Sequence, residues 1–120
     1  MEFTDKRFFK AFKMLQETIH NNSKNHGFWP KGKRNVPEAL MLIVSELSEA
    51  LEDYRDNKLT TYVSNYINGN DKPCGFPTEL ADAVVRILDL AEGMKIDLLP
   101  VIVRKMLYNE SRPYKHGRKL

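Results

Sequence analysis

Two acidic pairs are the residues of this chain whose types and spacing suit chemistry. Glu46 and Glu49 form an E-x-x-E pair, and Glu79 and Asp82 form an E-x-x-D pair. Each pair lies in a segment with helical periodicity, where residues three apart are neighbours on one face. Clustered carboxylates repel one another, and a divalent cation removes that repulsion because hard cations prefer oxygen ligands. If the two helices run antiparallel and face each other, the four carboxylates could hold Mg²⁺ against a polyphosphate.

The helices that carry these pairs are the clearest elements of the sequence. Residues 37–55 have a proline only at the front edge, where a helix accepts it, and an apolar stripe opposite the acids. That stripe is formed by Leu40, Ile43, Val44, Leu47, Leu51 and Tyr54. Residues 78–91 are apolar over most of their circumference, so we expect this helix to be buried on most sides. Its charged residues Glu79, Asp82, Arg86 and Asp89 share one strip, which should face a cleft or form ion pairs within the helix.

Further candidate site residues lie on either side of these helices. Lys105, Asn109 and Arg112 recur at i, i+4 and i+7 on a last helix that should begin near residue 97 or 98 and stop at Pro113. Trp29, the only tryptophan, sits in a polar loop over residues 21–35. It either stacks on a nucleobase or plugs the end of a helical bundle, and the sequence favours neither.

Composition restricts the class of protein. The length suits one domain over residues 1–120, and no apolar run is long enough to span a bilayer. The first residues lack the apolar core of a signal peptide, and the single cysteine fits a reducing compartment, so we expect a cytoplasmic location. The net charge is +3, with basic clusters separate from the acidic helices. That separation suits an anionic ligand bridged by metal, and nucleic acid is a less favoured partner.

The remaining elements complete an all-α prediction. A first helix should run from a cap at Thr4 to about Asn21, with Phe8, Phe12, Leu15 and Ile19 as its apolar stripe. Residues 56–77 form a long connection whose middle could be a short helix or an extended segment. The chain has no phosphate-binding glycine loop, no Ser/His/Asp signature and no metal-ligand spacing of histidines. Metal-assisted hydrolysis is therefore the main chemical option.

These motifs resemble those of the MazG-like, all-α nucleoside triphosphate pyrophosphohydrolases. That family's pattern is E-x-x-E, a spacer and E-x-x-D on a four-helix bundle, and it appears here at Glu46/Glu49 and Glu79/Asp82. The run KMLYNESRP from Lys105 is similar to the family's K-x-x-x-N-x-x-R-P end. The resemblance covers roughly residues 35–119. The spacer is longer than the family's, which gives a four-helix-bundle-like MazG-type fold with a long loop between the acidic helices.

The resemblance implies hydrolysis of a (d)NTP to the monophosphate and pyrophosphate with Mg²⁺, for which Mn²⁺ can substitute. The four acids would be the metal ligands and catalytic residues, with Glu46 or Glu49 as an alternative general base. Lys105, Asn109 and Arg112 would bind the phosphates, and Trp29 would contact the base. Family members are commonly dimers or tetramers whose subunits complete one another's pockets, so a homodimer or homotetramer is expected. Such an activity would serve nucleotide pool control or house-cleaning.

Three alternatives stand beside this reading. The same metal chemistry could act on dUTP or phosphoribosyl-ATP, and base selectivity would separate these substrates. A non-catalytic helical module could bind metal or a partner, with its acids solvated or ion-paired. A nucleic-acid binder acting through Lys31–Arg34 and the basic tail would show affinity that falls steeply with salt and depends little on Mg²⁺.

Overall fold

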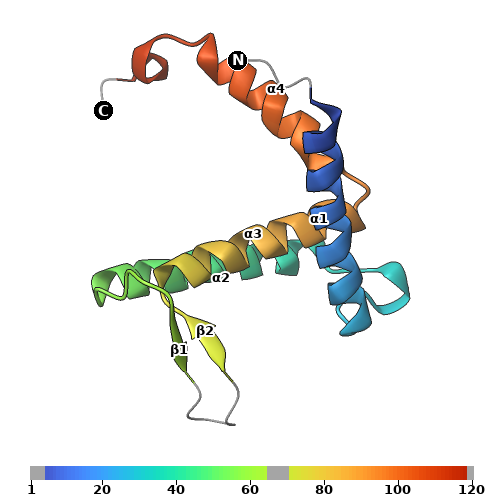
Figure 1. Cartoon of the computed structure of the whole chain (residues 1–120), viewed down its shortest axis with the longest axis vertical. Coiled ribbons are helices and arrows are strands. Elements are labelled where there is room, and N and C mark those ends of the chain that lie inside the picture. Colours follow the sequence, from blue (N-terminus) through green and yellow to red (C-terminus); the bar gives the residue numbers. More distant parts are fainter. Residues whose placement is uncertain (1–4, 65–70, 119–120) are drawn as a thin grey trace.

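The computed structural model describes residues 5–64 and 71–118, and helices make up most of this part of the chain (Figure 1). The all-α prediction is confirmed. In chain order the elements are α1 (Lys6–Asn25), η1 (Pro30–Gly32), α2 (Val36–Arg55), β1 (Tyr62–Ser64), β2 (Lys72–Cys74), α3 (Phe76–Gly93), α4 (Leu98–Glu110) and η2 (Tyr114–Gly117). Within the described ranges, no helix combines the length and the apolar character that crossing a bilayer requires.

The helix ends follow from local capping. Asp5 caps α1 by accepting a hydrogen bond from the backbone N–H of Arg7, whereas the predicted cap, Thr4, lies outside the described residues. This first helix continues four residues beyond the predicted end at Asn21. Asn35 caps α2 by accepting from the backbone N–H of Glu38, and α2 ends at Arg55 as predicted.

Helices α2 and α3 run antiparallel side by side and bring the two acidic motifs together (Figure 1). Small side chains let the two helices approach closely: Ala39 and Ala50 of α2 and Ala83 and Ala91 of α3 are buried. The acidic side of α2 therefore turns inward. Its leucine stripe instead lies at the surface of the single chain, where Leu40, Val44, Leu47 and Leu51 are exposed.

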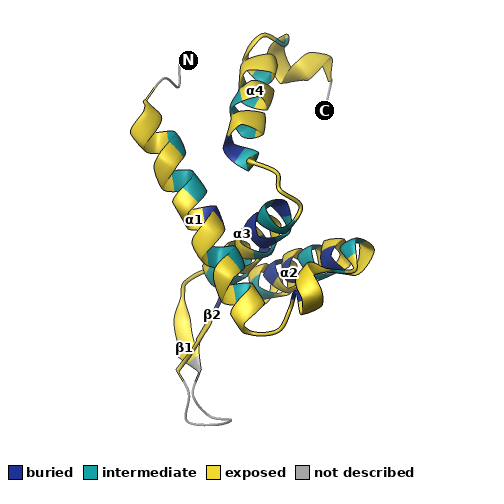
Figure 2. Cartoon of the chain, turned by 90° about the vertical axis from the view of Figure 1, so that its right-hand side faces the viewer, coloured by how far each residue is buried: buried dark blue, intermediate teal, exposed yellow. Residues whose placement is uncertain are grey.

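The expectation that residues 78–91 are buried on most sides is wrong for the single chain. Leu80, Val84, Val85 and Ile87 of α3 are exposed, because the contacts of α3 with α2, α1 and β2 leave these side chains uncovered in the described part of the single chain (Figure 2). The buried apolar residues of α3 are Ala83, Leu88 and Ala91.

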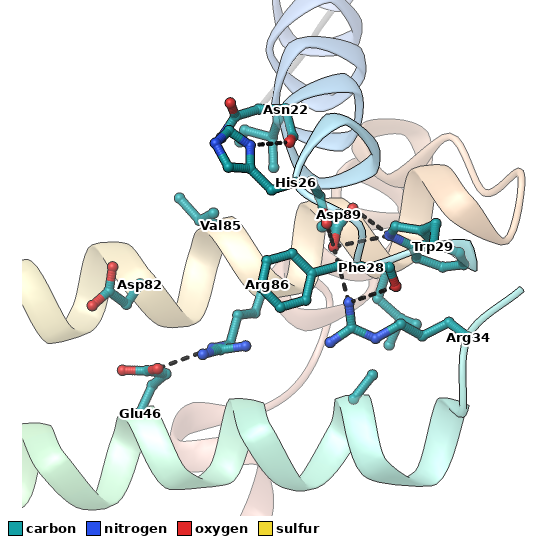
Figure 3. Close-up of a pocket in the computed structure, with 14 residues that line it drawn as sticks. Asn22, His26, Phe28, Trp29, Arg34, Glu46, Asp82, Val85, Arg86 and Asp89 are labelled. Carbon is teal, nitrogen blue, oxygen red and sulfur yellow. Dashed lines mark hydrogen bonds and ion pairs between the residues drawn. The ribbon is translucent and has the colours of Figure 1, made fainter. Parts of the chain in front are cut away.

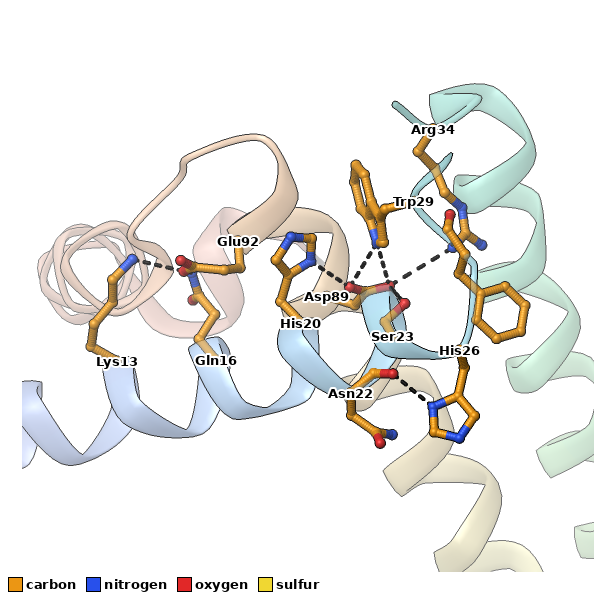
Figure 4. Close-up of polar contacts among 11 residues, drawn as sticks. Lys13, Gln16, His20, Asn22, Ser23, His26, Trp29, Arg34, Asp89 and Glu92 are labelled. Atoms are coloured by element: carbon orange, nitrogen blue, oxygen red, sulfur yellow. Dashed lines mark hydrogen bonds and ion pairs between the residues drawn. The ribbon is translucent and has the colours of Figure 1, made fainter. Parts of the chain in front are cut away.

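Helix α1 crosses α3 and is held there by a polar contact. The fully buried side chain of Gln16 donates from Nε2 to the carbonyl oxygen of Ile96 over 2.7 Å and to Oε1 of Glu92 over 2.9 Å (Figure 4). Lys13 donates to the same Glu92 oxygen over 2.7 Å. These bonds attach α1 to the turn between α3 and α4, because Glu92 lies near the end of α3 and Ile96 in that turn.

Helix α4 packs on α1 and diverges from the α2–α3 pair (Figures 1 and 2). The radius of gyration is 17.3 Å, whereas a compact domain of this length has about 14 Å. The four predicted helices are present, and in a single chain they form an open arrangement rather than a closed bundle.

The long connection between α2 and α3 contains a β-hairpin. Strands β1 and β2 pair antiparallel, with Val63 opposite Pro73. The middle of the connection is thus extended where it is described. Residues 65–70, which join the two strands, lie outside the described part.

Candidate functional site

Three of the four predicted carboxylates meet between α2 and α3. Glu46 of α2 and Glu79 and Asp82 of α3 each offer a carboxylate oxygen, and these oxygens lie within 4.8 Å of one another. Glu46 is buried, Glu79 is half-buried and Asp82 is exposed, so the group spans from the helix interface to solvent. The antiparallel packing of α2 and α3 brings Glu46 next to Glu79 and Asp82, which lie 33 and 36 positions further along the sequence.

The clustering changes the acidity of these groups. Burial, together with the neighbouring carboxyl groups of Glu49 and Glu46, raises the pKa of Glu79 to about 7. Burial also raises the pKa of Asp82, and the charge of Glu46 adds to that effect. Glu49 is exposed and lies outside the close triad, although it contacts Glu79. At neutral pH without a cation, the cluster therefore retains a proton for part of the time.

The donor set fits a divalent cation. Oε2 of Glu79 is a buried side-chain oxygen with no hydrogen-bond partner among the described residues when the neighbouring carboxyls are ionised. A proton shared between Glu79 and Glu49 or Glu46 reduces the repulsion between these carboxylates, in agreement with the raised pKa of Glu79. A hard cation relieves it more fully, because it binds several carboxylate oxygens at once and replaces their mutual repulsion with attraction.

Arg86 pairs across the helix interface. Its Nε donates to Oε1 of Glu46 over 2.9 Å, so the guanidinium reaches from α3 to α2 (Figure 3). The sequence suggested ion pairs of Arg86 with Asp82 or Asp89 on its own helix. In the structure Arg86 pairs with Glu46 instead. Its charge still acts on Asp82 and opposes the rise in the pKa of that residue.

A pocket of about 390 Å³ extends from these residues toward the loop after α1 (Figure 3). One end is acidic and contains Glu46 and Asp82, with Arg86 beside them. The other end is aromatic and polar, and it is lined by Asn22, His26, Phe28, Trp29 and Arg34. The pocket thus has one end suited to a cation and phosphates and another suited to a planar group.

Trp29 lines the pocket but is itself held in place. It is 7% exposed, and its indole Nε1 donates to Oδ1 of Asp89 over 3.0 Å. Its ring meets the His20 ring edge to face, with centroids 4.9 Å apart. A Cβ on Gly93 would overlap the six-membered ring, so glycine is required at that position of α3 for the close approach. The contacts of Trp29 are those of a plug at the end of the helices.

Asp89 is the centre of a polar network that sequence reasoning did not include in the site. Besides Trp29, it accepts from Nδ1 of His20 and from Oγ of Ser23, each over 2.8 Å, and the guanidinium of Arg34 lies 3.9 Å away (Figure 4). His20 must carry its proton on Nδ1 to donate this bond. The signal in the sequence was the position of Asp89 on the charged strip of α3. Its partners lie within residues 20–34, far from Asp89 in the sequence, and helical spacing reveals only neighbours on the same helix.

The predicted phosphate-binding residues of α4 lie elsewhere in the single chain. Lys105, Asn109 and Arg112 are absent from the lining of this pocket. Lys105 and Arg112 instead flank the ring of Tyr108, with their charged groups 4.9 and 5.5 Å from its centroid. The divergence of α4 from α2 and α3 accounts for this placement (Figure 1).

No protein-family model, curated protein or solved structure matches the chain. The MazG-like resemblance therefore rests on the motifs alone, and a functional assignment must rest on the site.

Proposed function

We propose that this chain is a Mg²⁺-dependent pyrophosphohydrolase that converts a nucleoside or deoxynucleoside triphosphate to its monophosphate and pyrophosphate. The observation that carries this proposal is the meeting of Glu46, Glu79 and Asp82 beside a pocket that is lined by Glu46 and Asp82 at one end and is aromatic at the other. Three carboxylates with an unsatisfied buried oxygen suit a hard cation. Arg86 beside them suits an anion, and the pocket volume of about 390 Å³ suits a nucleotide rather than free phosphate.

The carboxylates divide into two roles. Glu46, Glu79 and Asp82 would hold the cation, which when bound supplies the charge that offsets the triphosphate and polarises the attacked phosphorus. Glu49 stands outside the triad and is exposed, so we assign it as the general base that takes a proton from the attacking water. Water adds to the α-phosphorus, the bond from that phosphorus to the bridging oxygen breaks, and pyrophosphate leaves with the electron pair.

The aromatic end would receive the base. Phe28 lines the pocket and is 55% exposed, whereas Trp29 is buried and committed to Asp89. We therefore assign the stacking surface to Phe28 and the hydrogen-bonding groups to Asn22 and His26. In this assignment Trp29 contacts the nucleotide from the pocket wall and holds the loop in position.

A homodimer or homotetramer would complete the site. The apolar stripes of α2 and α3 are exposed in one chain, and a stripe of this kind normally marks a protein interface. Helix α4 keeps Lys105, Asn109 and Arg112 out of the pocket of its own chain. We propose that they reach the pocket of a second copy, where their charges would bind the triphosphate.

A pyrophosphate-release assay tests the proposal. The eight common NTPs and dNTPs are incubated with Mg²⁺ and the wild type, Glu79→Gln, Asp82→Asn, and Glu52→Gln as a control on the exposed side of α2. We expect pyrophosphate and monophosphate from the wild type and the control, with at least about a hundredfold loss in both site variants. Release of orthophosphate, or full activity in a folded site variant, would contradict the proposal.

The second candidate is a non-catalytic helical module that binds a metal or a partner. The ion pair of Arg86 with Glu46 favours it, because this pair neutralises one carboxylate without a cation. This module would release no pyrophosphate from any nucleotide, and its site variants would change stability or partner binding only. A dUTPase-like or phosphoribosyl-ATP-specific enzyme would instead show the same site dependence with a restricted substrate.

A further inference from the structure

Arg86 stands at the junction of the two halves of the pocket. It projects from the charged strip of α3, one turn after Asp82, and its guanidinium lies between the acidic end and the Phe28 ring (Figure 3). Its Nε–H bond to Glu46 is the contact that the structure gives its head group. Its side chain is 37% exposed, compared with 10% for Glu46, so the arginine is the more accessible partner of the pair.

The carboxylate of Glu46 cannot bind the guanidinium of Arg86 and a divalent cation equally well at the same time. It belongs to the triad whose oxygens converge, and it also accepts from Arg86. A divalent cation bound by the triad would lie close to the guanidinium, and two positive charges at such a distance repel. Cation binding at this site therefore requires Arg86 to weaken or leave its bond to Glu46.

Arg34, the other arginine of the pocket, has no bond to the three clustered carboxylates that cation binding would break. Its side chain is 13% exposed, it donates to the carbonyl oxygen of Phe28 over 3.3 Å, and it lies near Asp89. These contacts hold it at the aromatic end. Arg86 is the arginine with both an acidic partner in the triad and access to the pocket.

We propose that Arg86 is an exchange residue that pairs with Glu46 while the site lacks a cation and turns to a phosphate oxygen of the polyphosphate once a cation is bound. This inference rests on the proposed function. Both ligands then favour the same position of Arg86, so each one tightens the binding of the other. Arg86 makes the site a poor binder of the cation alone and a good binder of the cation together with a polyphosphate.

The test measures the two ligands separately in the full chain. Calorimetry first follows Mn²⁺ binding to the protein without nucleotide. It then follows, at saturating Mn²⁺, the binding of a nucleoside triphosphate analogue whose α–β bridge cannot be hydrolysed. The variants are Arg86→Gln, Arg86→Lys and the control Arg55→Gln, which removes a guanidinium paired with Glu52 on the exposed side of α2.

We expect Arg86→Gln to bind Mn²⁺ about tenfold more tightly and the analogue about tenfold more weakly, because it removes a positive charge that opposes one ligand and attracts the other. Arg86→Lys, which keeps the charge but not the fork of donors, should give intermediate values for both. The control should change neither affinity. If Arg86→Gln does not fold, Arg86→Leu removes the same charge and must show the same opposite shifts.

The outcomes separate this inference from the proposed function. Affinities for Mn²⁺ and the analogue that fall together, or a Mn²⁺ affinity that stays constant, would overturn the exchange role while the pyrophosphohydrolase proposal stands. A wild type that binds no Mn²⁺ even in the presence of the analogue would overturn both. An unchanged analogue affinity in Arg86→Gln would show that Arg86 only neutralises Glu46, which also overturns the inference.

Discussion

The indole Nε1 of Trp29 donates to Oδ1 of Asp89 over 3.0 Å and joins the loop after α1 to the charged strip of α3. Asp89 lies two turns beyond Asp82 on that strip, so this bond sets the aromatic end of the pocket relative to the acidic end. His20 and Ser23 bond to the same carboxylate, so α1 is positioned by the same group.

Trp29→Phe tests this arrangement. The variant keeps a ring but removes the N–H donor from a buried carboxylate, which should lower the free energy of unfolding by about 1–3 kcal/mol. Denaturant unfolding followed by circular dichroism measures this. Phe28→Leu at the neighbouring exposed position should leave stability nearly unchanged and raise KM for the nucleotide. A larger stability loss at Phe28 than at Trp29 would reverse the two roles.

The raised pKa of Glu79 predicts a pH dependence of stability in the absence of divalent cations. Its folded-state pKa of about 7 exceeds the ordinary 4.5, so the folded state binds more protons than the unfolded state between these values. The free energy of unfolding contributed by Glu79 should therefore decrease as pH rises from about 4.5 to about 7. Thermal unfolding in EDTA should show this decrease in the wild type relative to Glu79→Gln. The same decrease in both proteins would assign it to another group.

Mg²⁺ should reverse that loss of stability. A cation that binds only the folded state at a hundred times its Kd stabilises it by about 2.7 kcal/mol. We expect Mg²⁺ at pH 8 to raise the Tm of the wild type by several degrees and to leave that of Asp82→Asn nearly unchanged. Equal shifts in the two proteins would place the cation elsewhere.

Glu49→Gln distinguishes a ligand from a base. Because Glu49 lies outside the triad, the variant should bind Mn²⁺ within about threefold of the wild type and lose about 10²–10⁴-fold in kcat. Calorimetry and the pyrophosphate assay measure the two quantities. A Mn²⁺ affinity lost together with the activity would identify Glu49 as a fourth ligand.

Leu47→Glu tests the exposed stripe of α2. A charge in the centre of an apolar interface is strongly unfavourable, so the variant should elute as a smaller species than the wild type in light-scattering chromatography. Met14→Glu on α1 places the same charge at another exposed apolar residue and should leave the mass unchanged. A wild type with the mass of one chain, 14.0 kDa, would contradict the proposed oligomer.

A shared site predicts complementation. Asp82→Asn and Arg112→Gln should each be inactive alone, because each removes one half of every pocket. Mixing them under conditions that exchange subunits should restore about a quarter of the sites in a dimer, since one pocket of each mixed dimer is intact. Failure to recover activity after verified exchange would place Arg112 outside the partner's pocket.

The sequence alone determined the helices and the acidic motifs. Periodicity and local caps act over a few residues, so α2 was predicted within one residue of its start and α4 from its first turn. The E-x-x-E and E-x-x-D pairs were visible because helical spacing places residues three apart on one face.

The tertiary structure decided which faces meet. Ala39, Ala50 and Glu46 of α2 are buried whereas its leucine stripe is exposed. Arg86 bonds to Glu46 rather than within its own helix. Asp89 gained its partners from a distant loop, and α4 carried its cations away from the pocket. Helical periodicity specifies neighbours on one helix only, whereas these contacts depend on the packing of side chains from different helices.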